Sequence, residues 1–352
     1  HMLYAFRYTN GEPPLSPEVS RLLYGSTLTA SVSRMERFAA CPFMQFASHG
    51  LRLKERRIYR LEPPHIGQLF HAALNRMAKR MIEEGIRWRD LSPSELARRA
   101  EEAVEWIAPR LQGEILYSSR RYLYMSRKLK GIVSRTAHAL GDHAKRGDFE
   151  PVALELGFGP GETLRPAPFI LSNGARMELV GRIDRVDAAP FEGGELLRVI
   201  DYKSGDAALS LQDVYDGLSL QLLTYLDVVI SQAEQWRGKP AIPGGALYFH
   251  VHHPIIQSFR PLTDEEREEA LLKEFKMNGL VSADKRVILA MDNQLTKGRS
   301  PIIPVGIKAD GGFYSESQVA DEQQLSGILR FVRNKMKKIG DEIVEGRVEI
   351  KP

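Results

Sequence analysis

The stretch from Gly181 to Tyr225 constrains this chain more than any other part of its sequence. It holds three short strings in order, GRIDRVD, DYKSG and QLLTY. Their pattern predicts two β-strands followed by a helix, with Asp184 on the first strand. Asp201 and Lys203 are two residues apart on the second strand, so their side chains point to one face. Two carboxylates crowded together require a counter-ion, and a divalent cation supplies one.

The Asp-x-Lys string has a simpler alternative, which is a surface ion pair on an edge strand. The residues before Asp201, LLRVI, form a continuous apolar run, and such a run is typical of a buried strand. A buried strand that ends in Asp201 and Lys203 places charge at the end of a sheet. Gln221 and Tyr225 are four residues apart, so they share one face of the following helix. The combination favours a functional site over a surface ion pair.

Composition sets wide limits. The chain has 352 residues, 43% of them hydrophobic, which allows a sizeable core. The net charge of +4 permits a polyanionic partner without requiring one. Cys41 is the single cysteine of the sequence, which excludes an intrachain disulfide and indicates a reducing, cytoplasmic setting. No apolar run is long enough to span a bilayer, so no membrane contact is expected. We expect His1-Met2 to be a tag remnant and residues 1–30 to form a leader.

The chain before residue 151 is expected to be helical and the part after it to mix strands and helices. A capping pattern at Ser33 predicts a helix that reaches Gly50. Further helices are predicted over 65–84, 93–112, 118–146, 213–235, 263–277, 284–296 and 321–345. Strands are predicted over 151–158, 175–187, 195–205 and 244–253. The predicted fold class is therefore α/β.

The acid, the Asp-x-Lys string and the Gln-Tyr helix together resemble the RecB-like branch of the PD-(D/E)XK nucleases. The resemblance implies a restriction-endonuclease-like core of order αβββαβ with a mixed central sheet. It implies one nuclease domain over 31–352, with a large helical insertion at about 86–148, a catalytic sheet at about 151–260 and a helical C-terminal part at about 261–352. The activity it implies is a deoxyribonuclease that depends on Mg²⁺ or Mn²⁺, which activates water and neutralises phosphate charge.

Roles of single residues also follow from the resemblance. His71 lies in the string GQLFH, which is similar to the family's metal-binding histidine string, whereas a histidine on an apolar helix face is otherwise a packed core residue. The implied metal ligands are His71, Asp184, Asp201 and the main-chain carbonyl of Tyr202. The implied catalytic set is Asp184, Asp201, Lys203, Gln221 and Tyr225, with Lys203 acting on the attacking water.

Other charged residues leave alternatives open. Glu155 fits either an acidic site residue that some family members carry or a charge on the strand surface. His250 and His252 share a strand face, but no third spaced ligand accompanies them and His253, which favours a structural or DNA-facing role over zinc binding. Asp187 is interpreted as a surface acid near a turn.

Basic residues interleaved with tyrosines follow Ser119. Such a pattern can hold a phosphate backbone and stack on bases, and the alternative is a solvated helix face. The predicted DNA-binding set is Arg120, Arg121, Arg127 and Lys128. A second basic run covers residues 52–60.

The string ACPF at Cys41 resembles the AddB subunits of AddAB-type helicase–nucleases. The resemblance implies that Cys41 is one ligand of a 4Fe–4S iron–sulfur cluster in a longer natural protein, whose other three cysteines follow residue 352. A cluster takes four thiolates, so none is expected in this chain. Also implied are an AddA-type partner, DNA ends as substrate, a role in double-strand-break repair and cleavage of the 5′-terminated strand. A stand-alone exonuclease of the CRISPR-adaptation type and a DNA-binding module without cleavage are the alternatives.

Overall fold

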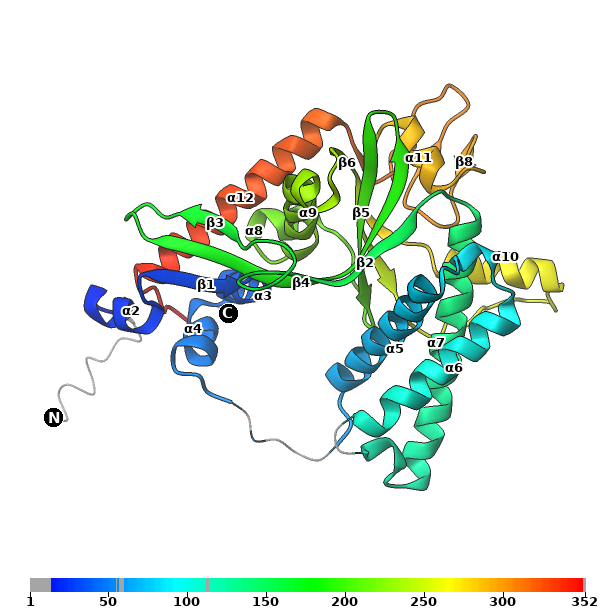
Figure 1. Ribbon diagram of the computed structural model, residues 1–352, viewed down its shortest axis with the longest axis horizontal. Helices are drawn as coiled ribbons and strands as arrows, with labels where there is room; N and C mark the ends of the chain where they lie inside the picture. The colour runs from blue at the N-terminus through cyan, green and yellow to red at the C-terminus, as the bar shows by residue number, and fades with distance from the viewer. Residues whose placement is uncertain (1–13, 55, 57–59, 112–113, 351–352) are drawn as a thin grey trace.

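The computed structural model describes residues 14–54, 56, 60–111 and 114–350 of the chain. A mixed sheet crosses the molecule, with helices on both of its faces and a helical lobe at one side (Figure 1). Its strands are β1 (Thr27–Ser31), β2 (Glu150–Phe158), β3 (Ala167–Ile170), β4 (Arg176–Phe191), β5 (Gly194–Lys203), β6 (Ala241–His250), β7 (Asn278–Ser282) and β10 (Val319–Ala320).

β4 connects the two halves of this sheet. Its N-terminal half pairs with β1 in parallel and with β3 in antiparallel fashion, and its C-terminal half pairs antiparallel with β2 and β5. β5 runs parallel to β6, and β6 runs antiparallel to β7. With α5 (Pro63–Glu84) and α9 (Gln221–Arg237), the order α5, β2, β4, β5, α9, β6 is αβββαβ. The predicted α/β class and mixed sheet are confirmed.

Apolar side chains fill both faces of the sheet. One layer contains α5, α6 (Pro93–Ile107) and α7 (Arg120–Lys145), and the opposite layer contains α3 (Val32–Ala40), α9 and α12 (Glu322–Val344). Side chains of β5 alternate between the layers, since Leu196 and Ile200 join the first and Leu197 and Val199 the second. Burial on both faces explains the apolar run that precedes Asp201.

The helices α6 and α7 occupy the range expected for an insertion and form the lobe below the sheet in Figure 1. α7 has 26 residues, so it is about 39 Å long. Near its C-terminal end, the His143 ring packs on Phe249 of β6 with ring centroids 5.5 Å apart. The N-terminal end of α7 therefore lies at the far end of the lobe from the sheet.

The N-terminal part of the chain differs from expectation. Residues 1–13 lie outside the described residues, but α2 (Pro17–Tyr24) and β1 form where a leader was expected, and β1 joins the sheet. The next helix is capped by Ser31, not Ser33, because the Ser31 hydroxyl accepts the Arg34 N–H. Pro42 interrupts that helix, which continues as α4 (Pro42–Gln45) and a π-helical turn over Phe46–Gly50.

Later elements are shorter than predicted. The helix expected over 213–235 is two helices, α8 (Leu211–Asp216) and α9, because Gly217 at φ 89° ends the first. α10 (Asp264–Glu274), α11 (Lys285–Met291) and a small hairpin of β8 (Gly298–Arg299) and β9 (Gly306–Ile307) follow. Among the helices of the described residues, none has both the length and the apolar composition needed to cross a membrane.

Candidate active site

β4 and β5 separate at the residues that carry the predicted carboxylates. Their ladder ends at the pair Arg185 and Ile200, and Asp184 and Asp201 are the next residues along. There Asp184 Oδ2, in place of a backbone carbonyl, accepts the Tyr202 N–H at 2.9 Å. The strands therefore part where the two carboxylates lie, and side chains from the adjoining elements reach that gap.

Three side chains from three elements meet around Asp184. His71 of α5, Glu155 of β2 and Asp184 of β4 each offer a ligand atom, and these atoms lie within 4.8 Å of one another. His71 Nδ1 is 3.2 Å from Asp184 Oδ2. Carboxylate oxygens suit Mg²⁺ and Mn²⁺, and an imidazole nitrogen favours the softer Mn²⁺. The geometry favours the site interpretation of Glu155 over the strand-surface alternative.

Glu155 is also strained. Its φ of 49° lies in the left-handed region, which costs a residue with a side chain roughly 1–2 kcal/mol. The neighbouring pairs Leu154 with Arg185 and Leu156 with Ile183 remain in register, so the distortion is local. Backbone strain of this kind clusters at functional sites. The sequence gives no sign of it, since nothing in PVALELGF requires a positive φ.

Burial and like charge perturb the acids of this group. Burial and then the Asp184 carboxylate raise the pKa of Asp201 to about 6, against the opposing effect of Lys203. Burial and Asp184 likewise raise the pKa of Glu155. Burial lowers the pKa of His71, but its contact with Asp184 and the surrounding negative charge outweigh burial and raise it. A bound divalent cation would relieve this repulsion, and the donor set therefore fits one.

Lys203 links the carboxylates to α9. Its Nζ forms an ion pair with Asp201 Oδ2 at 2.6 Å, although the contact is poorly aligned for a hydrogen bond. The same ammonium donates to Gln221 Oε1 at 3.1 Å, and Gln221 Nε2 donates to the Tyr225 hydroxyl at 2.9 Å. Burial lowers the pKa of Lys203, but Asp201 outweighs it and raises the pKa. Lys203 is therefore a cation that can neutralise charge or orient water.

Two glycines of the recognised strings permit close approach at the site. A Cβ on Gly67 would lie 3.2 Å from Ser204 Oγ, so glycine lets α5 approach the loop after β5. A Cβ on Gly181 would lie 2.7 Å from the Phe158 ring and 3.4 Å from the Tyr225 ring. Both positions exclude a larger side chain without movement of the neighbours.

Asp187 is not a surface acid, and that interpretation was wrong. It is 0% exposed and accepts hydrogen bonds from Arg185 and Arg198. Burial raises its pKa, but the two guanidinium groups outweigh burial and lower it. Arg185 also donates to the Tyr202 hydroxyl at 3.4 Å, and the Tyr202 ring lies edge-on to the His71 ring with centroids 6.0 Å apart. The buried triad therefore supports the residues beneath the site.

The histidines after β5 have structural surroundings. His250 Nε2 lies 2.7 Å from the Ala207 carbonyl oxygen, and the His252 ring packs on Phe275 at 5.0 Å. His253 is exposed. Within the described residues these histidines belong to no group of metal ligands, which agrees with the structural interpretation.

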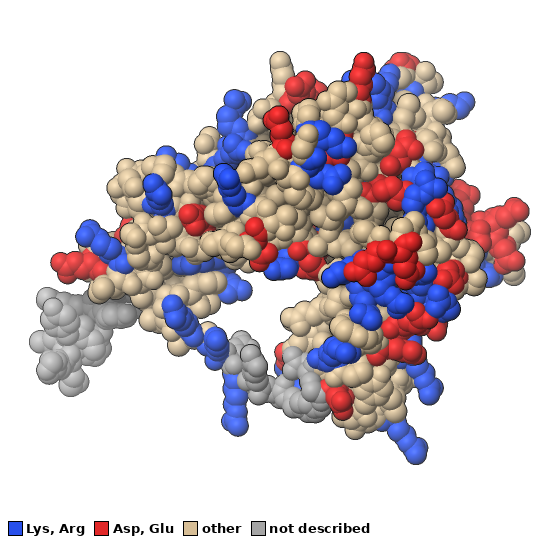
Figure 2. All heavy atoms as spheres, in the orientation of Figure 1, with Lys and Arg blue, Asp and Glu red and all other residues tan. Residues whose placement is uncertain are grey.

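The predicted DNA-binding set lies at the N-terminal end of α7. Arg120, Arg121, Arg127 and Lys128 are exposed. Arg127 precedes His143 by about 24 Å along the helix axis, so these residues lie well away from the carboxylates. Figure 2 shows basic side chains projecting from this end of the lobe and an opening between the lobe and the sheet. In the second basic run, Arg57 lies outside the described residues.

Cys41 is buried at the end of α3. The next turn contacts the C-terminal segment, because the Phe43 N–H donates to the Glu349 carbonyl at 3.2 Å. The last described residues therefore run beside Cys41, as the position of the C-terminus in Figure 1 also shows.

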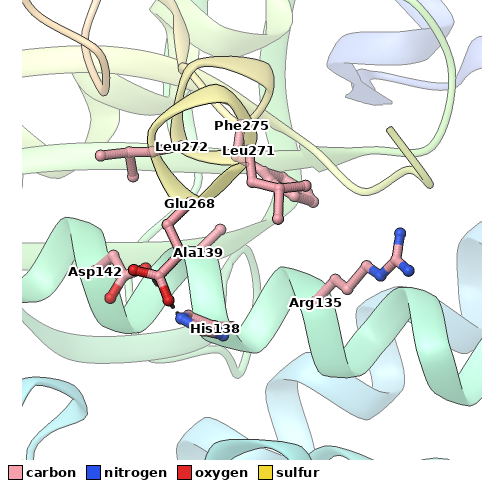
Figure 3. Close-up of a pocket in the computed structure, with 8 residues that line it drawn as sticks. All are labelled: Arg135, His138, Ala139, Asp142, Glu268, Leu271, Leu272 and Phe275. Carbon is pink, nitrogen blue, oxygen red and sulfur yellow. Dashed lines mark ion pairs between the residues drawn. The ribbon is translucent and has the colours of Figure 1, made fainter. Parts of the chain in front are cut away.

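A separate hollow of about 50 Å³ lies between α7 and α10 (Figure 3). Leu271, Leu272 and Phe275 line it from α10 and the residue after it, and His138 Nε2 is 3.2 Å from Asp142 Oδ2 at its edge. A space of this size holds one or two waters at most. It belongs to the packing of α10 on the lobe and contains none of the site residues.

A mixed αβββαβ sheet with a His, Asp, Asp-x-Lys and Gln-Tyr site at a strand separation defines a PD-(D/E)XK-type nuclease fold. The chain matches the PD-(D/E)XK nuclease superfamily over residues 29–352 and belongs to it. It is 49% identical over 354 residues to an ATP-dependent helicase/deoxyribonuclease subunit (AddB) of Geobacillus kaustophilus (strain HTA426), an alignment that covers 100% of this chain and 30% of the relative. The protein of the same name from Bacillus subtilis (strain 168) is 48% identical over 345 residues, covering 98% of this chain and 30% of that protein.

The chain therefore spans about 30% of the length of the curated relatives it matches. The resemblance to RecB-like nucleases and to AddB subunits, inferred from a few short strings, is confirmed over nearly the whole chain.

Proposed function

We propose that this chain is the nuclease domain, over residues 31–352, that hydrolyses DNA phosphodiester bonds with Mg²⁺ or Mn²⁺. The observation that carries the proposal is the convergence of His71, Glu155 and Asp184 within 4.8 Å. Beside them lies Asp201, with its raised pKa, paired with the Lys203 ammonium at 2.6 Å. Like charges crowded in a buried gap, with a cation beside them, suit metal-assisted attack on a phosphate.

The roles of the residues follow from their contacts. His71, Asp184, Asp201, Glu155 and the main-chain carbonyl of Tyr202 would hold the metal, which when bound supplies charge neutralisation and a more acidic water. Lys203 stabilises negative charge on the phosphate and orients the attacking water. Gln221 holds the Lys203 ammonium, and Tyr225 holds Gln221 in turn.

In the longer protein, we propose a module of a helicase–nuclease that processes double-strand breaks with an AddA-type partner in the cytoplasm. The relatives' printed name, a helicase/deoxyribonuclease subunit, supports this assignment. The substrate would be single-stranded and duplex DNA ends, with the 5′-terminated strand cleaved. Arg120, Arg121, Arg127 and Lys128 would contact DNA at the outer end of the lobe, before it reaches the carboxylates.

We propose that Cys41 binds a 4Fe–4S cluster in that longer protein. The contact of the Phe43 N–H with the Glu349 carbonyl supports it, because chain that follows residue 352 would leave from beside Cys41. Iron analysis of a longer chain with the following cysteines, and of its Cys41→Ala variant, tests this. Equal iron content in the two would contradict it.

The test of the nuclease assignment is incubation of the purified chain with linear single-stranded and duplex DNA in Mg²⁺, Mn²⁺ or EDTA. We expect cleavage with either metal and none in EDTA, and Asp201→Asn should abolish it. The matched control is Asp227→Asn, which alters another partly buried acid that pairs with a basic residue, Arg333 at 2.6 Å. DNA binding without cleavage under any of these conditions would contradict the proposal and leave the binding-module alternative.

A further inference from the structure

The helix that carries Gln221 and Tyr225 begins without a capping side chain of its own. Its N-cap residue is Leu220, whose side chain offers no acceptor. The first backbone N–H groups of a helix need partners, and an unpaired one is costly when buried. Glu36 of α3 supplies the acceptor. Its Oε1 accepts the Leu220 N–H at 2.7 Å and the Gln221 N–H at 2.9 Å.

This contact joins elements that are far apart in the sequence. α3 packs against α9 and against α12, so Glu36 lies inside the helical layer that covers the sheet. A carboxylate at a helix N-terminus is also stabilised by the helix dipole. Burial raises the pKa of Glu36, and the two backbone hydrogen bonds oppose that effect. The charges of Lys203 and Asp201 act on it as well, which indicates that Glu36 lies close to the site.

Contacts lead from Glu36 to Lys203 through one residue. Glu36 fixes the backbone of Gln221, and the Gln221 side chain accepts the Lys203 ammonium at 3.1 Å. The other contact of that ammonium is Asp201, which the proposed function assigns to the metal. When Asp201 serves as a metal ligand, Gln221 becomes the principal anchor of Lys203. The position of the ammonium then depends on how firmly the first turn of α9 is held.

We infer that Glu36 is a positioning residue of the nuclease site. It fixes the start of α9 and thereby places Gln221 and the Lys203 ammonium for attack on the phosphate. The inference rests on the proposed function, but Glu36 itself contacts neither the metal ligands nor the substrate position. Its acceptor oxygen carries the effect, so Glu36→Gln, which keeps an oxygen at the same reach, should preserve function, and Glu36→Ala should not.

The experiment is steady-state cleavage of a DNA oligonucleotide by the full chain with Mn²⁺, with calorimetric Mn²⁺ titration of each variant. Glu36→Ala should lower kcat by about 10-fold or more, the scale of a misplaced catalytic group. Its KM and Mn²⁺ affinity should stay within about twofold of the parent, and Glu36→Gln should recover kcat to within about threefold. The control is Asp321→Ala, which removes a helix cap at the start of α12, where Asp321 Oδ1 accepts the Gln324 N–H at 2.8 Å.

Hydrogen exchange at the Leu220 and Gln221 amides gives a readout that is independent of cleavage. Exchange should be faster in Glu36→Ala and unchanged in Glu36→Gln. The inference is overturned if Glu36→Ala leaves kcat or this exchange as in the parent, if Glu36→Gln is as impaired as Glu36→Ala, or if Mn²⁺ affinity falls in parallel with kcat. A parent chain that cleaves no DNA refutes the proposed function instead, and the exchange measurement then still decides whether Glu36 holds the helix start.

Discussion

Replacing Asp184 by asparagine should separate the stability of the metal-free domain from its stability with metal. In the metal-free protein, Asp184 Oδ2 accepts the Tyr202 N–H at 2.9 Å and lies 3.2 Å from His71 Nδ1. Asparagine retains an oxygen for the Tyr202 bond. It weakens the interaction with His71 but removes a charge that raises the pKa values of Asp201 and Glu155. These effects oppose each other, so the free energy of unfolding should change by about 1 kcal/mol or less.

With metal present, the parent and the variant should differ strongly. A ligand that binds only the folded state at 100 times its Kd stabilises by about 2.7 kcal/mol. In a domain of this size that raises Tm by roughly 5–10 °C. If loss of the Asp184 carboxylate weakens binding about 100-fold, the same metal concentration equals Kd and contributes about 0.4 kcal/mol. The expected shift in Tm is then about 1–2 °C.

Scanning calorimetry in EDTA and in MnCl₂ measures both quantities. The matched control is Asp142→Asn, because Asp142 Oδ2 lies 3.2 Å from His138 Nε2, the same separation as between Asp184 and His71. The control should keep the full Mn²⁺ shift. An Asp184→Asn protein that gains as much from Mn²⁺ as the parent would refute the assignment of Asp184 as a ligand.

Three further predictions concern pH, the buried triad and DNA. The pKa of His71 is raised above 6.5 in the folded protein; its contribution to metal-free stability should therefore be complete below pH 6.5 and be lost as pH rises through the folded pKa, while Mn²⁺ affinity rises over the same window, as urea unfolding and metal titrations at several pH values would show. Asp187→Asn leaves two buried guanidinium groups without a counter-charge and should cost about 3–5 kcal/mol in urea unfolding; a loss below about 1 kcal/mol would contradict the triad's role. Neutralising Arg120, Arg121, Arg127 and Lys128 together should weaken DNA binding and reduce its salt slope by about one unit per lost phosphate contact, whereas neutralising the ion-paired Arg87, Arg98, Arg260 and Arg286 should not.

The central strands and the core of the site were predictable because their signals are local. Asp201 and Lys203 follow an apolar run, and Gln221 and Tyr225 are spaced by one helical turn, so each pair reveals its own geometry. His71 depended on the resemblance, since an isolated histidine on a helix carries no such signal. The geometry that brings it to 3.2 Å from Asp184 required the sheet and α5 to pack together.

The residues that were misread depend on tertiary contacts. Asp187 and Arg185 share a face of β4, but the second partner, Arg198, comes from β5 and could not be assigned from spacing. Glu155 was left open because its left-handed backbone has no sequence signature. Glu36 was missed altogether, because its partners in α9 are distant in the chain and a lone glutamate on a helix resembles a solvated charge.

The expected leader failed for a related reason. Threonine and serine near Thr27 were interpreted as linker residues, but strand formation there depends on β4, whose N-terminal half offers a partner edge. Pairing of that kind is set by the far side of the sheet and not by local propensity.

Cleavage by a Lys203→Ala variant tests the central claim most directly. Lys203 carries the charge that acts on the phosphate and the attacking water, and it is not a metal ligand. Its loss should reduce DNA cleavage by about 10²-fold or more, while Mn²⁺ binding and DNA binding remain nearly as in the parent. Lys239→Ala, which removes a lysine paired with the buried Glu195 at 2.9 Å, should cleave as the parent does. A Lys203→Ala protein that cleaves as fast as the parent, or parent cleavage that persists in EDTA, would contradict the account.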